Sequence, residues 1–250
     1  MNAHTGKVKS AQPTGNTLAM LKNVAACYTL VEKLRSRTAK QCGIGVFYGY
    51  PGLGKTEASI YVRGKVRGVL VEMGHGWTPK HLLETILQQC GVAASGSVPK
   101  LQDTLIRYLA DEERPLIIDE ADKLMEKQMI EHIRTIQGVA RCPVLLIGEE
   151  KLPQKLQRWE HTHDRVLEFV SAQPCDLEDA RALSALFCPV ELEDELLDKI
   201  RREAQGRPRR MMNTFAAVAE FARNAGLTSL SIETYEGPFH TGAAPAPRSV

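Results

Sequence analysis

The sequence lacks the features that mark secreted, zinc-binding and membrane-spanning proteins. Its six cysteines are widely scattered and form no C-x-x-C pair, so neither a zinc ribbon nor a redox dithiol is indicated. The first residues are polar and have no apolar core of a signal peptide, and no later apolar run approaches the length that spans a membrane. We therefore expect a cytoplasmic protein with reduced thiols and no membrane partner.

The sequence also has little excess of one charge sign over the other. The 250 residues carry a formal net charge of only +2, which is too small to indicate a nucleic-acid binder from overall charge. Any contact with DNA would have to come from local basic patches. Hydrophobic residues make up 43% of the chain and charged residues 25%. This composition is typical of a globular chain that buries a core, as one large domain or as one with a small satellite.

What the sequence does contain is a phosphate-binding loop pattern. Residues 49–56 fit G-x-x-x-x-G-K-[ST] at every fixed position, after the apolar run 44–48 and before a stretch that reads as a helix. In such a loop, glycines let successive N–H groups turn toward phosphate oxygens at the positive end of a helix. Lys55 would reach the β and γ phosphates, and the Thr56 hydroxyl would help to bind Mg²⁺. We assign nucleotide binding to Gly49, Tyr50, Pro51, Gly52, Leu53, Gly54, Lys55, Thr56 and Glu57.

A second stretch supplies carboxylates. Residues 115–118 form an apolar run that ends in Asp119 and Glu120, as a buried strand does when it delivers acids to the ligand-binding end of a sheet. Asp119 would hold Mg²⁺ opposite Thr56, and Glu120 would orient and deprotonate the water that attacks the γ phosphate. A strand that ends in Asp-Glu is by itself often a helix cap, but downstream of a complete phosphate loop it indicates nucleotide chemistry.

Hydrophobic patterns predict alternating strands and helices as far as residue 170, and helices alone after it. The patterns predict helices over 17–40, 57–63, 78–90, 100–110, 125–137 and 152–159, and strands over 44–48, 68–73, 115–118, 143–147 and 166–170. Such an order points to a parallel sheet that is covered on both faces. Three further helices, over 176–187, 192–204 and 211–225, would form a small lid bundle.

From about Thr17 to Tyr235, these motifs and this order of elements resemble the AAA+ ATPase superfamily. The resemblance implies an α/β fold, in which a P-loop AAA+ parallel five-stranded sheet flanked by helices is followed by a small α-helical lid. The nucleotide-binding domain would span 17–170 and the lid 171–235, between a flexible arm at 1–16 and a flexible tail at 236–250. ATP and Mg²⁺ are the implied cofactors.

Within that superfamily, the compact size and the run VLLIGEEKLPQKLQR are similar to protein B of Mu-like transposable phages and its transposon-encoded relatives. These relatives are ATP-dependent DNA-binding regulators that select target DNA and activate a transposase. The resemblance therefore implies an ATPase that binds double-stranded DNA without sequence specificity, assembles with itself into a filament or ring, and has a transposase as partner.

The resemblance also assigns roles to single residues. Lys55 and Thr56 match the Walker A lysine and hydroxyl, and Asp119 and Glu120 match the Walker B pair. Glu149 follows the fourth strand, where the family places an amide or hydroxyl that senses the γ phosphate. A carboxylate is electrostatically unfavourable next to a phosphate, so the sensor role of Glu149 stays open.

Two arginines match catalytic positions of the family. Arg165 opens the fifth strand, where an arginine finger reaches the nucleotide of a neighbouring subunit; Arg158 is the competing candidate, and an ordinary surface arginine is the alternative. Arg209, in the run Gly206-Arg207-Pro208-Arg209-Arg210, matches the second sensor at the start of a lid helix. A basic turn between helices is the alternative there.

Other functions and features are weighed against these assignments. A helicase loader or a secretion-type ATPase would share every motif, whereas a P-loop kinase would need an acceptor pocket, for which no residues are evident. A non-hydrolysing interaction module is the remaining class.

His161 and His163 have no third ligand nearby for a metal. Trp77 is interpreted as core rather than as a DNA contact, and Lys123 and Lys127 as solvated surface rather than as lining of a filament axis.

Overall fold

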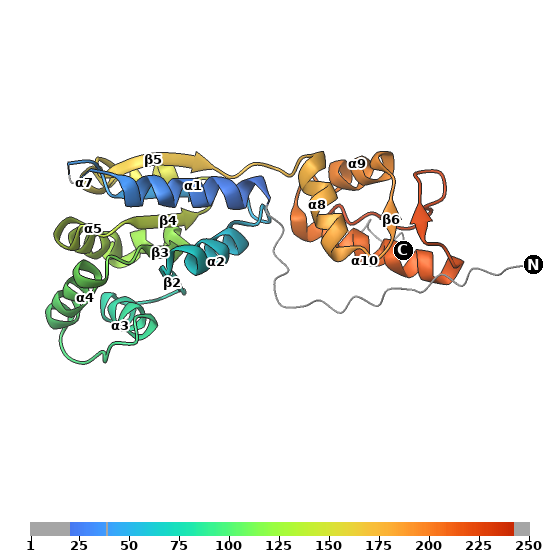
Figure 1. The fold of residues 1–250 in the computed structure, drawn as a ribbon. Coiled ribbons are helices and arrows are strands. Elements are labelled where there is room, and N and C mark those ends of the chain that lie inside the picture. The colour runs from blue at the N-terminus through green and yellow to red at the C-terminus, as the bar shows by residue number, and fades with distance from the viewer. Residues whose placement is uncertain (1–20, 39, 243–250) are drawn as a thin grey trace, which may run out of the picture.

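The computed structural model describes residues 21–38 and 40–242. The predicted arm at 1–16, the expected helix start at 17 and the last part of the predicted tail lie outside the described residues. One parallel sheet organises the first part of the chain, with strands in the order β2-β3-β4-β1-β5 (Figure 1). The strands are β1 (Ile44–Tyr48), β2 (Val69–Glu72), β3 (Leu116–Asp119), β4 (Val144–Gly148) and β5 (Val166–Ser171).

Alternate residues of the strands point to two separate cores, one on each face of the sheet. Phe47, Ile117 and Ile147 pack beneath two helices, α1 (Lys22–Ser36) and α2 (Lys55–Val66). Val46 and Ile118 point to the other face. That face is covered by α3 (Pro79–Gln89), α4 (Val98–Glu112), the 3₁₀ helix η1 (Ala121–Gln128), α5 (Met129–Ala140), α6 (Leu152–Leu156) and α7 (Glu160–His163). The period of two along each strand therefore yields a sheet that is covered on both faces, as expected.

Three helices follow the sheet, and we call them the helical lid. They are α8 (Leu177–Phe187), α9 (Asp194–Glu203) and α10 (Pro208–Ala225), with a small parallel pair formed by β6 (Glu191–Leu192) and β7 (Ser229–Leu230). Asp176 caps α8, since its side chain accepts from the Asp179 N–H and the Asp179 side chain accepts from the Asp176 N–H. The lid lies beside one end of the sheet (Figure 1), and Leu183 and Phe215 continue the core beneath α1 and α2.

Several predicted helix boundaries are wrong. The helix expected over 125–137 begins only at Met129, because Lys127 and Gln128 adopt positive φ values of 49° and 57° and separate η1 from α5. The helix expected over 152–159 ends at Leu156, and a separate short helix, α7, begins only at Glu160. The last lid helix begins at Pro208 rather than at 211, because proline is pre-set for the first position of a helix. The strands β6 and β7 were not expected.

A glycine in β1 sets how closely α1 approaches the sheet. A Cβ atom on Gly45 would lie 2.9 Å from Leu34 Cδ1 and 3.1 Å from Leu30 Cδ1. By contrast, a Cβ on Gly64, within α2, would have nothing within 4 Å. The close packing of α1 on β1 therefore depends on the missing side chain at position 45.

Two glycine substitutions should have opposite effects on stability. Gly45→Ala should lower the free energy of unfolding by about 1–3 kcal/mol, because it overpacks the contact between α1 and β1. Gly64→Ala should raise it by about 0.5–1 kcal/mol, because alanine favours the helix. Urea denaturation measures both, and equal values for the two variants would contradict this account of the packing.

Candidate functional site

The loop of residues 49–54 joins the carboxyl end of β1 to the first turn of α2. Gly52 and Gly54 have φ values of 85° and 80°, which glycine adopts without strain. The loop curls around Lys55, whose Nζ donates to the carbonyl oxygens of Gly49 at 2.7 Å and Tyr50 at 2.9 Å. The loop thus lies at the N-terminus of α2, where backbone N–H groups favour an anion.

Asp119 ends β3, and its carboxylate lies next to this loop. The residue is 4% exposed; its Oδ1 accepts from the Glu120 N–H at 2.8 Å, whereas its buried Oδ2 has no hydrogen-bond partner among the described residues. Burial raises the pKa of the Asp119 carboxyl, while the Glu120 N–H and the nearby Thr56 hydroxyl act to lower it. The two predicted nucleotide motifs therefore meet at one edge of the sheet, with Thr56 beside Asp119.

The chemistry of these donors fits a magnesium ion. A buried carboxylate oxygen without a partner is unfavourable in an apolar interior. Mg²⁺ prefers hard oxygen ligands and usually takes only one or two carboxylates from a protein. Asp119 and the Thr56 hydroxyl would supply such ligands, beside the lysine that would contact the phosphates. Burial lowers the pKa of Lys55, and the surrounding carboxylates act to raise it; they are Asp119, Glu120, Glu149 and Asp122, in that order.

Glu120 adopts an unusual backbone conformation at the start of η1. Its φ of 55° and ψ of 37° are left-handed, which is uncommon for a residue other than glycine. Its Oε2 lies 3.5 Å from Lys123 Nζ, and the same Nζ donates to the Met73 carbonyl at 2.8 Å. The Lys123 side chain is 17% exposed, so its interpretation as solvated surface is wrong. Lys123 instead ties the expected catalytic base to the end of β2.

Asp122 holds the segment that follows β4, a function that the sequence did not reveal. Its Oδ2 accepts from the Glu149 N–H at 2.7 Å, and its Oδ1 pairs with Lys155 Nζ at 2.7 Å. A Cβ on Gly148 would lie only 2.3 Å from Asp122 Oδ2, so glycine is needed there. The Glu149 side chain is exposed; its backbone, rather than its carboxylate, is what the structure fixes.

The lid begins directly on the phosphate loop. A Cβ on Gly52 would lie 3.5 Å from Arg207 Cδ, and one on Gly54 would lie 3.8 Å from Pro208 Cγ. Arg207 is therefore a lid arginine that lies next to the loop, and the sequence analysis predicted no role for it. Arg209 lies in the first turn of α10 and is exposed. The start of α10 and the phosphate loop are neighbours, as a sensor in the lid requires, but the role of Arg209 itself stays a prediction.

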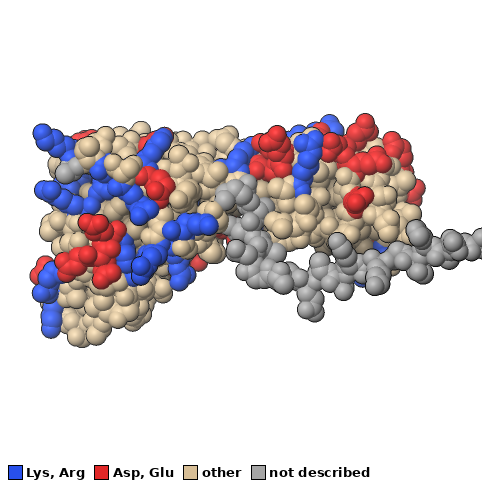
Figure 2. Space-filling view, in the orientation of Figure 1, with Lys and Arg blue, Asp and Glu red and all other residues tan. Residues whose placement is uncertain are grey.

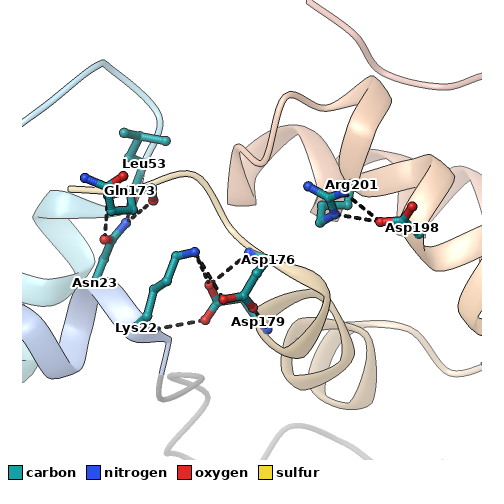
Figure 3. Close-up of polar contacts among 8 residues, drawn as sticks. All are labelled: Lys22, Asn23, Leu53, Gln173, Asp176, Asp179, Asp198 and Arg201. Atoms are coloured by element: carbon teal, nitrogen blue, oxygen red, sulfur yellow. Dashed lines mark hydrogen bonds and ion pairs between the residues drawn. The ribbon is translucent and has the colours of Figure 1, made fainter.

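A buried asparagine connects the loop to the lid (Figure 3). Asn23, in the first turn of α1, is 4% exposed. Its Nδ2 donates to the Leu53 carbonyl at 2.9 Å and to the Gln173 carbonyl at 2.7 Å, and its Oδ1 accepts from the Gln173 N–H at 2.8 Å. Lys22 beside it reaches α8, where its N–H donates to Asp179 and its Nζ to Asp176. One side chain thus links the phosphate loop to the segment that leads into the lid.

The two arginine-finger candidates lie elsewhere. Arg165 precedes β5, at the edge of the sheet opposite to the phosphate loop, and its Nη1 donates weakly to Gln137 Oε1 at 3.4 Å. Arg158 is exposed, after α6. From the opposite edge, Arg165 could reach a nucleotide only on another copy of the chain.

The remaining candidates are placed as follows. Trp77 packs against the core beneath α3 and α4 and meets the His81 ring edge-on at 4.6 Å. Lys127 Nζ donates to the Gly76 carbonyl at 3.1 Å. Within residues 21–38 and 40–242, no group of three or more His, Cys, Asp or Glu residues could hold a metal ion. No helix in these ranges is long and apolar enough to cross a membrane.

Comparison with known proteins places the site in a familiar fold. Residues 37–156 match a family model described as an AAA domain. Cdc6p from Pyrobaculum aerophilum is similar over 87% of this chain and 66% of its own, with a TM-score of 0.60 and 14% identity. The RuvB Holliday junction branch migration motor from Thermotoga maritima is similar over 85% and 66%, with a TM-score of 0.58 and 16% identity. ORC1 from Aeropyrum pernix, solved in complex with DNA, is similar over 85% and 62%, with a TM-score of 0.58 and 16% identity.

These similarities confirm the fold class, an α/β fold with a five-stranded parallel sheet flanked by helices. At such low identity, a likeness between structures shows the fold alone. The chain spans just under two thirds of the length of these solved chains. No curated protein sequence matches it. The resemblance to protein B of Mu-like phages is not confirmed by these comparisons.

Removing the buried charge at position 119 should separate stability from metal binding. Because burial raises the pKa of Asp119 above its value in the unfolded chain, the ionised carboxylate destabilises the fold above that raised pKa, and this destabilisation fades as the pH falls through it. Asp119→Asn should therefore unfold at a higher temperature than the wild type at pH 7 in EDTA. In thermal unfolding, the variant should also lose the stabilisation that Mg²⁺ and ATP give to the wild type. Asp103→Asn, on the exposed face of α4, is the control and should change neither; equal stabilisation of Asp119→Asn by Mg²⁺ and ATP would refute the metal site.

Asn23 should contribute far more to the free energy of unfolding than its neighbour Lys22. Asn23→Ala leaves the buried Leu53 carbonyl and the Gln173 backbone without their partner, which should lower the free energy of unfolding by about 1–3 kcal/mol. Lys22→Ala removes the ion pairs of a partly exposed lysine with Asp176 and Asp179 and should lower it by less than about 1 kcal/mol. Chemical denaturation of both variants checks the difference. Similar values would mean that the bonds of Asn23 do not hold the loop to the lid.

Proposed function

We propose that this chain is an ATP-dependent DNA-binding AAA+ ATPase that assembles on double-stranded DNA and acts in DNA transposition. The observation that carries the nucleotide part is the position of Asp119, which lies beside Thr56 and near Lys55 at one edge of the sheet, and whose buried Oδ2 has no hydrogen-bond partner in the described part of the chain. A triphosphate and its magnesium ion need this combination of a lysine, a hydroxyl and a carboxylate next to a helix N-terminus. The match to the AAA domain model supports the same interpretation.

In the proposed reaction, the loop and Lys55 would bind the β and γ phosphates, and Thr56 and Asp119 would hold Mg²⁺. Bound Mg²⁺ would neutralise the charge that develops on the transferred phosphoryl group. Glu120 takes a proton from the attacking water, and its left-handed backbone and its contact with Lys123 fix where the carboxylate lies. Arg207 lies next to the loop, and Arg209 would contact the γ phosphate as the second sensor, so that the position of the lid follows the state of the nucleotide.

Assembly supplies the remaining catalytic group. Arg165, or else Arg158, would act on the nucleotide of an adjacent copy, where it stabilises the charge of the transition state. Hydrolysis would then require a filament or ring, and the conversion of ATP to ADP and phosphate would disassemble that filament or ring. The likeness to ORC1, which was solved in complex with DNA, supports a DNA partner. The run VLLIGEEKLPQKLQR supports transposition and a transposase partner, although its Lys155 has a structural contact with Asp122.

A lysine substitution tests the gating of DNA binding by ATP. Lys55→Ala should lose ATP binding and, with it, ATP-dependent binding to duplex DNA, whereas Lys65→Ala, on the exposed end of the same helix, should keep both. Fluorescence anisotropy of a labelled duplex, with ATP and with ADP, measures the DNA affinity. Full DNA affinity in Lys55→Ala would count against ATP-gated assembly.

A second substitution tests hydrolysis. Glu120→Gln should keep ATP and DNA binding but should hydrolyse ATP about 10²–10⁴-fold more slowly, because the general base is lost. Phosphate release reports the rate, and electron microscopy with ATP and duplex DNA should show assemblies that persist. Unchanged phosphate release would remove Glu120 from the mechanism.

A pull-down with the ATP-bound protein identifies the partner. If it captured a replicative helicase rather than a transposase, the result would favour a helicase loader, which uses the same site.

A further inference from the structure

A basic pocket lies at the amino end of the sheet, on the edge opposite to the phosphate loop. It has a volume of about 670 Å³ and is formed where the C-termini of α1, α4 and α5 meet the starts of β1, β4 and β5. Five cations line it: Arg35, Arg37, Lys40, Arg141 and Arg165. Figure 2 shows blue side chains gathered at the end of the sheet that is far from the lid, with an acidic area next to them. The pocket is therefore separate from the site at Lys55.

The pocket carries more positive charge than is required to balance the negative groups of the fold around it. Each of the three helix C-termini carries about half a negative charge, and Glu113 is the one acidic residue among the lining residues. These groups amount to about 2.5 negative charges, so the five cations leave a surplus of about 2.5 positive charges. Neutralising the helix ends therefore explains only part of the cluster.

The five cations differ in how far they are already engaged. The Arg37 guanidinium donates to the Leu34 and Arg141 carbonyls and so caps α1 and α5, which is a structural role. Arg35 pairs with Glu32 at 2.7 Å, and the one bond of the Arg165 side chain to another described residue is the long one to Gln137.

Lys40 and Arg141 form no side-chain hydrogen bond or ion pair with another described residue, and both are exposed. Arg141 has a φ of 55° at the end of α5, where glycine would be more favourable. The backbone conformation at position 141 therefore does not favour arginine over glycine. Two exposed cations thus flank a hollow that also contains the Arg165 guanidinium.

We propose that this basic pocket binds phosphate groups, and that Lys40 and Arg141 hold the backbone of duplex DNA there. The inference rests on the proposed function and names the DNA-binding surface that the function requires. Guanidinium and ammonium groups that come from separate segments suit a series of backbone phosphates, since such contacts position DNA without reading its sequence. The triphosphate of an adjacent copy is the other source of phosphate, because Arg165 is expected to reach it.

The salt dependence of DNA binding tests the pocket. In the full chain with ATP, the double substitution Lys40→Gln and Arg141→Gln should weaken binding to a labelled duplex and reduce the slope of log affinity against log salt by about 1.8, or 0.9 for each lost phosphate contact. The control double substitution, Lys100→Gln and Arg107→Gln on the exposed face of α4, removes the same charge and should leave the slope unchanged. Thermal unfolding confirms that both variants fold.

The outcomes separate the sources of phosphate. In one outcome, the double variant of Lys40 and Arg141 keeps a normal salt slope but, assembled without DNA, hydrolyses ATP several-fold more slowly. That result would assign the pocket to the triphosphate of the neighbouring copy. It would support a phosphate pocket and refute the DNA contact. An unchanged slope and unchanged hydrolysis would overturn the inference, while the proposed function would stand. If the wild type bound no duplex with ATP, the proposed function itself would fail, and the DNA contact with it.

Discussion

The Asp119 carboxylate is buried beside Lys55 and Thr56, and the order and direction of the strands place it there. β3 and β1 are not neighbours, since β4 lies between them. The acid and the phosphate loop meet only because all three strands are parallel and end at the same edge. An ionised group in such a position destabilises the fold unless a cation accompanies it. The folded protein thus contains a destabilising buried carboxylate at the point where the proposed function needs a metal ion and a triphosphate.

The sequence predicted the parts of this site that have a local signature. The phosphate loop, the acids after an apolar run and the five strands are each recognised within a few residues, because glycine geometry and hydrophobic period are local properties. The contacts that hold the site together are not local. Asp122 bonds to residue 149, and Asn23 bonds to residues 53 and 173. An asparagine in the first turn of a helix looks like any surface residue until the fold buries it, so no pattern in the chain could have shown its role.

The wrong boundaries have the same origin. Lys127 and Gln128 adopt left-handed conformations that their residue types do not favour, and η1 is held instead by contacts with the segment that follows β2, such as the bond from Lys123 to the Met73 carbonyl. Tertiary contacts therefore override local preference beside the expected catalytic base. In the lid, Gly206 has a φ of 62°, and a Cβ there would lie 2.8 Å from the Cys175 nitrogen. This close approach fixes the turn before α10, and with it the position of Arg207 on the phosphate loop.

The two edges of the sheet have consequences for assembly. Lys55 and Asp119 lie at one edge, and Arg165 lies at the other, so a single copy cannot complete its own site if Arg165 acts on the nucleotide. The contact between copies would then join two different surfaces, and a contact of that kind closes into a ring or continues as a filament. Because Asn23 and a continuous core connect the phosphate loop to the lid, a change at the nucleotide would also move the surface that the next copy contacts. In the proposed assembly, the same hydrogen bonds that position the loop therefore transmit the nucleotide state from copy to copy.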